Sequence, residues 1–446
     1  MTNTAKNIFT QEFDQVRKTL PGADLPWLAA HRAGAMARFA EAGLPHRRLE
    51  AWRYTDLARL LAKKSFAPAT PHVGAVMLPD VAQRPVAGLF AGHDRYVMLF
   101  VNGFFRPDLS RLDGLPAGVD IMPLTEALAA PWAKPLLTRP EESAGEAVVA
   151  LNDALMRDGM AMRIGAGVVL DKPVHLTFVN LNGAPEAAHI RNLIRFEEGA
   201  QATLFETHIG LGSAFLADKV TDISLAPGAR LTRLNVQDEA PDTLHIATDR
   251  LTLDMQARYE GLTVTFGGGV TRNQTEVALM GAGAHLGLYG AYAQRASEHC
   301  DSTCVVDHAV PECTSETFFR GVLDGAATGV FQGKVIVRPD AQHTQATQTS
   351  NALLLSRNAA MNAKPELEIY ADDVQCSHGS TIGELDHAAM FYLMSRGIPE
   401  TQARSLLVTA FLTEVLEKAG DPALSGELIG LAEIWLAETR LGKVRP

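Results

Sequence analysis

A short glycine–alanine segment decides the fold, because it returns along the chain at nearly constant spacing. It reads Glu198-Gly199-Ala200-Gln201-Ala202, then Pro227-Gly228-Ala229-Arg230-Leu231, and later Ala282-Gly283-Ala284-His285-Leu286. Between the last two, Met255-Gln256-Ala257-Arg258-Tyr259 keeps the alanine without the glycine. The shared alanines at 200, 229, 257 and 284 are 29, 28 and 27 residues apart. A repeat of this length is typical of a solenoid, in which each rung stacks on the next.

The region around these segments has the pattern of a strand-rich core. Apolar and polar residues alternate over residues 174–178, 202–205 and 251–253, and glycine, proline and aspartate separate such stretches. Alternation is typical of β-strands, and glycine suits the corners between them. We therefore predict a mainly β fold with a right-handed parallel β-helix over residues 160–385. A β-sandwich stays open as the alternative, because the loop lengths are irregular.

Helical patterns precede this core. Apolar residues recur at helical spacing over residues 9–20, and a second helix is predicted over residues 27–42. The dipeptide Asn102-Gly103 predicts a tight hairpin turn between two apolar stretches. A short helix is expected over residues 147–156. Residues 1–159 are thus predicted to form an N-terminal helical domain with a small hairpin region.

Helical spacing returns near the C-terminus. One helix is expected to start with Pro399 at its first position and to end before Gly420, and a last helix is expected near residues 424–441. We predict a C-terminal helical domain over residues 386–446. Its amphipathic helices need an apolar surface, supplied by this chain or by a partner.

Composition and charge exclude several classes of protein. The 446 residues are 47% hydrophobic and 20% charged, unlike a disordered chain. Four cysteines are too few for a disulfide scaffold, and a net charge of −11 disfavours general binding of nucleic acid. We find no signal-peptide pattern and no apolar run of membrane-spanning length. The expectation is a soluble, cytoplasmic protein without nucleic-acid or membrane partners.

The densest polar cluster is Asp372-Asp373-Val374-Gln375-Cys376-Ser377-His378-Gly379-Ser380. Residues two apart on a strand share a face, so Cys376 and His378 are expected to point the same way. A thiolate beside an imidazole suits a soft or borderline metal, or a Cys–His nucleophile pair. A small core cysteine next to a turn histidine is an equally good interpretation of these residues alone.

Other candidate sites are weaker. His299, Cys300, Cys304, His308 and Cys313 lack the tight spacing of zinc motifs, so buried thiols are the favoured interpretation. Residues 49–55 mix aromatic and charged residues and are interpreted as a turn docked on a core. Gly333-Lys334 is followed by valine, which removes the Ser/Thr of a Walker loop. Any use of ATP would therefore come from a partner.

Several motifs in the last quarter of the chain occur together in one known family. They are Phe331-Gln332-Gly333-Lys334, Gln348, Asn351-Ala352-Leu353-Leu354-Leu355-Ser356, Lys364-Pro365-Glu366-Leu367-Glu368-Ile369-Tyr370-Ala371-Asp372-Asp373, Cys376-Ser377-His378-Gly379, Phe391-Tyr392-Leu393 and Ser395-Arg396-Gly397-Ile398. This stretch resembles the core of the SufB/SufD family of iron–sulfur cluster assembly proteins. The Cys-Ser-His-Gly run, and residues 49–57 with Glu50, Trp52, Tyr54 and Thr55, resemble the SufD members. Two departures are Gln375, where lysine is usual, and His343-Thr344-Gln345, where a Lys-Thr-Asp-like run is frequent.

The resemblance implies a fold and a function. The fold is a right-handed parallel β-helix between two helical domains, which favours the solenoid over the sandwich. The function is that of a non-enzymatic scaffold subunit, which pairs with a SufB-like paralogue and docks an ABC-type ATPase, SufC, through its C-terminal helices. A nascent iron–sulfur cluster would form at the interface with the paralogue, and an isolated chain could form a homodimer. His378 matches the residue that the family implicates at that interface, and Cys376 lies beside it, so both are expected to bind metal. Partner binding is expected at Phe391, Tyr392, Arg396 and Gly397.

Two functions of other classes remain open at this point. A carbohydrate-active β-helix enzyme would use Asp372 and Asp373 as acid and base, although adjacent strand residues point to opposite faces. A purely structural partner of the SufB-like chain would carry no ligand. Substitution of Cys376 or His378 separates that role from the scaffold.

Overall fold

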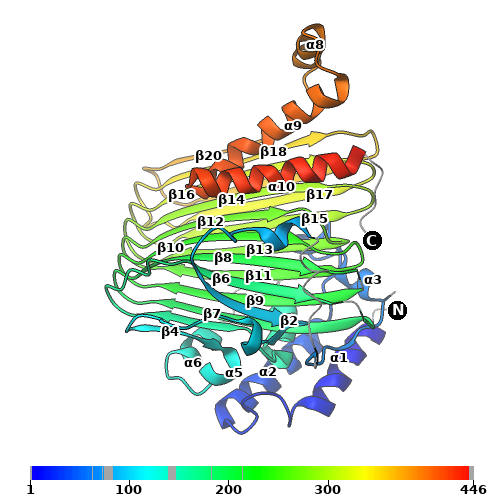
Figure 1. Ribbon diagram of the computed structural model, residues 1–446. Helices are drawn as coiled ribbons and strands as arrows, with labels where there is room; N and C mark the ends of the chain where they lie inside the picture. Colours follow the sequence, from blue (N-terminus) through cyan, green and yellow to red (C-terminus); the bar gives the residue numbers. More distant parts are fainter. Residues whose placement is uncertain are drawn as a thin grey trace.

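The computed structural model describes residues 3–62, 64–72, 74, 84–138, 147–181, 183–212 and 214–440. It is mainly β, with a parallel β-solenoid of about eight turns flanked by N-terminal and C-terminal helices (Figure 1). Strands of successive rungs pair in parallel throughout the solenoid, for example β8 with β10 and β10 with β12. The parallel pairing confirms the predicted solenoid and excludes the antiparallel sandwich.

The N-terminal region combines helices with short strands. Its predicted helices and hairpin are present, although the first helix ends at Val16 rather than continuing to Leu20. The hairpin turn has positive φ at both Asn102 and Gly103, as a type I′ turn requires. The elements are α1 (Asn3–Val16), α2 (Pro26–Ala42), η1 (Glu50–Trp52), α3 (Leu57–Leu61), β1 (Ala67–Pro68), η2 (Pro85–Gly88), β2 (Tyr96–Val101), β3 (Phe104–Phe105), η3 (Pro107–Leu109), β4 (Val119–Pro123), α5 (Leu124–Ala127), α6 (Ala133–Leu137) and α7 (Ala147–Leu155).

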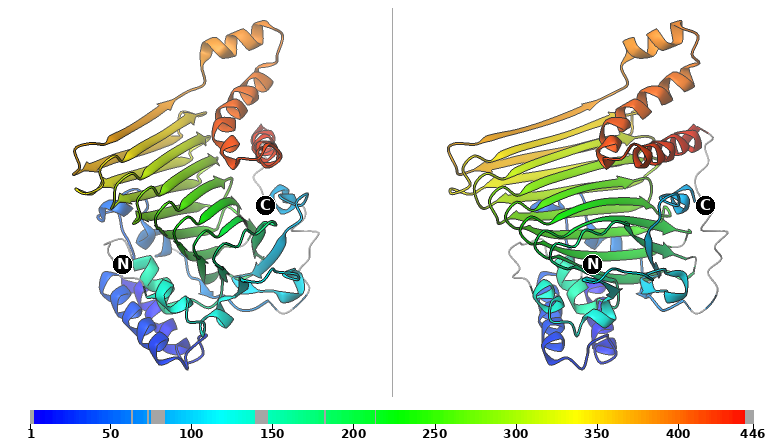
Figure 2. Two further views of the ribbon diagram at one scale, coloured as in Figure 1. Left: turned by 90° about the vertical axis from the view of Figure 1, so that its left-hand side faces the viewer. Right: turned by 60° about the vertical axis from the view of Figure 1, so that its left-hand side comes forward.

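The solenoid strands form two sheets that face each other across a common interior (Figure 2). Sheet I runs β4-β5-β7-β9-β11-β13-β15-β17-β19, and sheet II runs β3-β2-β6-β8-β10-β12-β14-β16-β18-β20. The strands are β5 (Met160–Ile164), β6 (Val174–Asn180), β7 (Glu186–Phe196), β8 (Gln201–Gly210), β9 (Phe215–Leu225), β10 (Arg230–Asp238), β11 (Leu244–Leu253), β12 (Arg258–Thr265), β13 (Val270–Leu279), β14 (His285–Gln294), β15 (His299–His308), β16 (Thr314–Leu323), β17 (Thr328–Val337), β18 (Gln345–Leu354), β19 (Ala360–Ile369) and β20 (Gln375–Gly383).

One corner of each rung carries the sequence repeat. Ala200, Ala229, Ala257 and Ala284 are fully buried there and follow residues with positive φ, three glycines and Gln256. The same corner recurs in two later rungs, where Cys313 and Thr344 replace the alanine and Glu312 and His343 take the positive φ. The repeat therefore extends beyond the part that sequence comparison detects, because the backbone conformation persists after its glycine is lost.

Three apolar layers hold the fold together. The interior between the sheets is one layer, and its residues come from both sheets, among them Met162, Leu204, Ile223 and Leu253. The outer face of sheet I packs on α1, α2 and α7, and the outer face of sheet II packs on α9 and α10. Most strands are thus buried on both faces, which limits the number of exposed polar side chains along them.

The C-terminal helices follow the last rung in sequence, and only the first of them points away from the solenoid. They are α8 (His387–Ser395), α9 (Glu400–Leu416), η4 (Glu417–Ala419) and α10 (Pro422–Arg440). Helices α9 and α10 lie on sheet II, whereas α8 projects away from the solenoid (Figure 1). Pro399 is the residue before α9 rather than its first helical residue, because its ψ of 145° is extended. Leu441, the expected end of the last helix, lies outside the described residues.

The two ends of the solenoid differ. At the first end, the two-residue strand β3 and the antiparallel strand β4 terminate the sheets. At the other end, β19 and β20 have no further strand beside them among the described residues. Pro365 lies in β19, where the hydrogen bond from Ala360 to Ala327 shows that odd-numbered amides point away from β17. A proline is tolerated there because that edge makes no ladder hydrogen bond.

None of the helices in the described part of the chain is long and apolar enough to span a membrane.

The corner stack predicts that its small residues resist enlargement. Replacing Ala257 with leucine should lower the free energy of unfolding by about 1–3 kcal/mol, because the added atoms have no space between Ala229 and Ala284. The midpoint of denaturant unfolding checks this. Met255→Leu, at a half-exposed position of the same corner, is the matched control and should leave stability within about 0.5 kcal/mol. Equal denaturation midpoints for the two variants would contradict the tight stacking of small residues at this corner.

Candidate functional site

Cys376 and His378 lie on β20, the last strand of sheet II. Cys376 is in register with Ala346 of β18, and His378 is in register with Gln348. Ala346 and Gln348 are buried in the interior between the sheets, so their register partners face the same way. The two candidate ligands therefore share the inward face at the open end of the solenoid, where no rung covers them within the described residues.

The two side chains differ in environment. Cys376 packs beside Val337, Ala341 and Ala346 and is half-buried, whereas His378 is exposed. Burial raises the pKa of the Cys376 thiol, while a backbone hydrogen bond at Ala346 opposes the shift. The thiol is accordingly protonated at neutral pH. A metal ion or a partner cation is needed to favour its thiolate form.

Gln348 forms the floor beneath His378. Its Nε2 donates to the Gly333 carbonyl at 3.3 Å, and the residue is 2% exposed. A Cβ atom on residue 333 would lie 2.4 Å from that amide nitrogen, so a larger residue there would displace the Gln348 amide from this position. This contact explains why Gly333 and Gln348 occur together in the motif set.

Asp372 and Asp373 do not lie on a strand, so the argument that they point to opposite strand faces is wrong. They occupy the turn between β19 and β20. Asp373 pairs with His343 Nδ1 at 3.0 Å, and its amide donates to Gln342 Oε1 at 2.9 Å. Both carboxylates are exposed, and these contacts join two neighbouring turns. The pair has the surroundings of a turn, not those of an enclosed acid–base site.

Residues 49–57, here called the strap, dock on the outer face of sheet I, as the turn interpretation predicts. Trp52 is buried, and the guanidinium of Arg272 on β13 lies 4.1 Å from its ring centroid. Thr55 Oγ1 donates to Asp301 Oδ2 on β15 at 2.5 Å, and the same carboxylate pairs with Arg272. The strap is therefore anchored by buried and charge-assisted contacts.

Two more contacts carry the strap to the last rung. Gln332 Nε2 on β17 donates to the Ala51 carbonyl at 3.2 Å. Lys364 on β19 donates to Glu50 Oε1 at 2.7 Å, and this contact lowers the pKa of that carboxyl. The strap thus crosses four neighbouring strands and ends on the rung that presents Cys376 and His378.

The other cysteines are buried, as the favoured interpretation predicts. Cys300 and Cys304 face the interior of the solenoid, and burial raises the pKa of each thiol to about 12. Cys313 is the small residue of a rung corner, and His308 Nε2 lies 2.9 Å from Ser315 Oγ. These protonated thiols fill the core and are poor ligands in this state.

The proposed partner residues lie on and just after α8. Phe391 is 75% exposed and Tyr392 is 57% exposed. The Arg396 guanidinium lies 5.1 Å from the Tyr392 ring centroid, and Gly397 has a φ of +86°, which favours glycine. Phe391 and Tyr392 thus expose large aromatic side chains on a projecting helix, as residues of an interaction surface often do.

Sequence reasoning misses a third group, inside the solenoid. His208, Glu239 and His245 are buried, and they bring donor atoms within 4.8 Å of one another. Burial lowers the pKa of His208 to about 4, and the nearby Lys219 ammonium acts in the same direction. Within the described residues, no other His, Cys, Asp or Glu cluster meets this three-donor criterion. The residues are 31 and 6 positions apart and form no recognisable spacing motif, so only the fold reveals them.

Comparison with known proteins covers nearly the whole chain. Residues 178–411 match the family model described as "SUF system FeS cluster assembly, SufBD core domain", and residues 3–176 match "SufBD protein N-terminal region". An iron–sulfur cluster assembly SufBD family protein of Synechocystis is 32% identical over 414 residues, covering 90% of this chain and 89% of that protein. The iron–sulfur cluster assembly protein SufD of Escherichia coli is 29% identical over 393 residues, covering 87% and 88%.

The burial of the thiols predicts selective labelling. Under native conditions one thiol of four should react with a maleimide or aromatic disulfide reagent, and Cys376→Ala should abolish that reaction. All four thiols should react in denaturant. Because the pKa of Cys376 is raised, its rate should keep increasing with pH above the range of an ordinary thiol. Native labelling of Cys300, Cys304 or Cys313, read by peptide mass spectrometry, would contradict their placement.

Proposed function

Since the chain belongs to the SufBD family of SUF-system iron–sulfur cluster assembly proteins, with SufD-like sequence, we propose that it is a non-enzymatic scaffold subunit on which a nascent cluster is built and passed on. The observation that carries the proposal is that Cys376 and His378 share one face of the last rung, which no further strand covers within the described residues. The cluster is cargo in this scheme rather than a resident cofactor.

The donor chemistry supports this role. Thiolate sulfur and imidazole nitrogen are both ligands of iron in iron–sulfur centres. Two side chains leave coordination positions vacant, so a second chain must complete the site. Because Cys376 is only half-buried and His378 is exposed, an incoming iron ion or partner residue can reach both without a change in the rung.

The open edges suggest how that second chain binds. On β20, Gln375 donates to the Thr344 carbonyl, so the amides of Cys376, His378 and Ser380 point away from β18. An unpaired row of this kind accepts another strand. The neighbouring edge of β19 carries Pro365, which interrupts its row of donors. We therefore propose that a SufB-like paralogue adds its own terminal strand to β20 and supplies the remaining cluster ligands; a second copy of this chain can take its place when the chain is alone.

The C-terminal helices offer a second partner surface. Phe391 and Tyr392 expose their rings on α8, and Arg396 and Gly397 follow at its end. The sequence lacks a Walker loop, so energy from ATP must come from another chain. We propose that a SufC-like ATPase docks on this projecting helix, and that its motion is transmitted to the last rung.

Substitutions in the motif test the cluster site. His378→Ala and Cys376→Ala should leave the complex with the paralogue and the ATPase intact, because β20 pairs with β18 through its backbone and alanine keeps a small apolar side chain beside Ala346. Iron and acid-labile sulfide per complex, isolated anaerobically, should fall at least tenfold. Removing one of few ligands costs at least what second-sphere changes cost, about 10–100-fold in affinity.

His343→Ala is the matched control, since it removes an exposed histidine that pairs with Asp373 of the neighbouring turn and leaves Cys376 and His378 unchanged. It should load iron and sulfide as the unaltered chain does. Normal loading in the Cys376 and His378 variants would reject the ligand assignment and leave a purely structural partner. Loss of the complex itself in those variants would reject the separation of docking from cluster binding.

The strand-edge mechanism has its own test. Ser380→Pro removes one outward amide of β20 and spares the hydrogen bonds to β18, so the monomer should stay folded. Binding to the SufB-like chain, measured by interferometry, should weaken roughly tenfold, as expected for about 1.4 kcal/mol. Ser380→Ala retains the amide and should bind normally. Unchanged affinity of the proline variant would show that the partner does not pair with this edge.

A further inference from the structure

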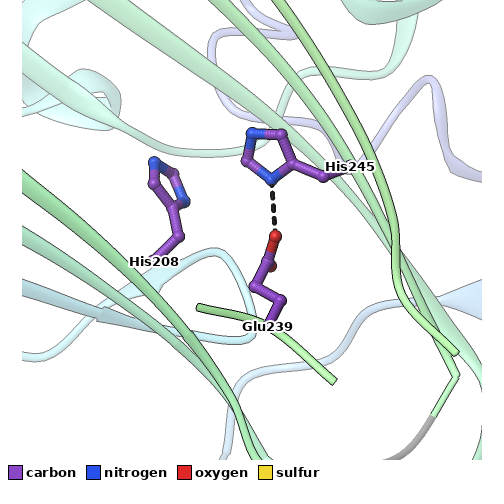
Figure 3. Close-up of side chains that lie close together, drawn as sticks. All are labelled: His208, Glu239 and His245. Carbon is purple, nitrogen blue, oxygen red and sulfur yellow. Dashed lines mark ion pairs between the residues drawn. The ribbon is translucent and has the colours of Figure 1, made fainter. Parts of the chain in front are cut away.

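Deep inside the solenoid, far in sequence from the motif of the last rung, polar side chains interrupt the apolar interior. His208 comes from β8, Glu239 follows β10, and His245 comes from β11 (Figure 3). Their donor atoms all lie within 4.8 Å of one another, and each residue is at most 2% exposed. We propose that these three side chains hold a divalent transition-metal ion, such as Zn²⁺ or Fe²⁺, that links the two sheets.

The rung geometry brings the donors together from opposite walls. His208 is in register with Gln237 of β10, and Glu239 lies two residues further along on the same side. His245 belongs to sheet I and reaches the other two from across the interior. One ring nitrogen of His208 is turned toward the other two residues in the close-up (Figure 3). An ion bound here would therefore contact both sheets at once.

The surroundings hold each donor in the manner of second-sphere groups at metal sites. His208 Nε2 lies 2.7 Å from Glu206 Oε1, which directs its other nitrogen toward Glu239 and His245. Asn180 Nδ2 and Gln237 Nε2 each donate to a different oxygen of Glu239 at 2.7 Å. Each carboxylate oxygen keeps a lone pair for an ion.

One contact in the group is left incomplete. His245 Nδ1 lies 2.8 Å from Glu239 Oε2, yet this buried nitrogen makes no aligned hydrogen bond. Donor atoms around a tetrahedral zinc ion, bonded at about 2.0–2.1 Å, are roughly 3.3 Å apart. A small opening of this pair would therefore admit an ion between atoms that now meet at a poor angle.

The balance of buried charges around the group also favours a bound cation. Arg233 pairs with Glu206 at 2.6 Å and with Asp249 at 2.7 Å, and Lys219 also pairs with Glu206. These two cations offset those two carboxylates, so the buried charge of Glu239 needs a further positive partner. A proton on His245 is one source and a metal ion is the other. Two imidazoles and a carboxylate form the ligand set of many zinc and non-haem iron(II) centres.

The experiment measures metal content in a chain whose surface site has been removed. A Cys376→Ala/His378→Ala chain is denatured with chelator and refolded with either one equivalent of Zn²⁺ or none. After gel filtration, elemental analysis should find about one zinc per folded chain in the first case. Adding His245→Gln or His208→Gln should lower the bound zinc at least tenfold. His189→Gln is the matched control. His189 is as buried as His245 and lies 2.6 Å from the Asp218 carboxylate, but it does not belong to the group of three donors.

Two further measurements test the site in case the histidine variants fail to fold. Asn180→Ala removes one donor to Glu239 and retains all three ligands, so it should fold and bind zinc about 10–100-fold more weakly. Refolding with Co²⁺ should give the visible absorption of cobalt bound to nitrogen and oxygen, and His189→Gln should retain it. Zinc-free chain after refolding with Zn²⁺, or equal zinc in the His245→Gln chain, would overturn the proposal and assign the charge of Glu239 to a proton on His245. Neither result bears on the cluster site, which is absent from every chain tested.

Discussion

The stacking of small buried side chains at one corner of every rung is the constraint on which the rest of the structure depends. Ala200, Ala229, Ala257 and Ala284 allow adjacent rungs to approach to parallel-strand distance, and a positive φ before each one turns the chain into the next strand. Because this register is kept to the last rung, residues far apart in sequence lie directly above one another. The positions of Cys376 over Ala346 and of His378 over Gln348 follow from it.

A rung with no neighbour on one side loses half of its ladder contacts, so something else must hold it. The strap does this from outside: Trp52 and Thr55 fix it to β13 and β15, and Glu50 reaches Lys364 on the final strand of sheet I. The end of the solenoid can then present polar and half-buried side chains without coming apart. The N-terminal strap and the Cys376–His378 segment, some 320 residues apart in sequence, lie on the same rung.

The sequence predicted what depends on local pattern. The repeat indicated the solenoid, the Asn102-Gly103 turn indicated the hairpin, and the two-residue spacing put Cys376 and His378 on one face. It failed where the deciding contact is distant or where pattern is lost. The corners at Glu312 and His343 keep the backbone shape without glycine or alanine, and Asp372 and Asp373 sit in a turn that strand periodicity cannot distinguish from a strand. The interior group of His208, Glu239 and His245 is assembled from different rungs and both sheets, so no local spacing in the sequence could predict it.

The difference between the two ends of the solenoid has a consequence for the proposed strand pairing at β20. The first end is finished by the two-residue strand β3 and by the reversed strand β4, neither of which continues the parallel ladder. If a partner strand pairs with β20 as proposed, the β3/β4 end offers no matching parallel edge for a third chain. Association by strand pairing along the solenoid axis would then stop at two chains, alike or different, and the stacked sheets would not grow into a fibre.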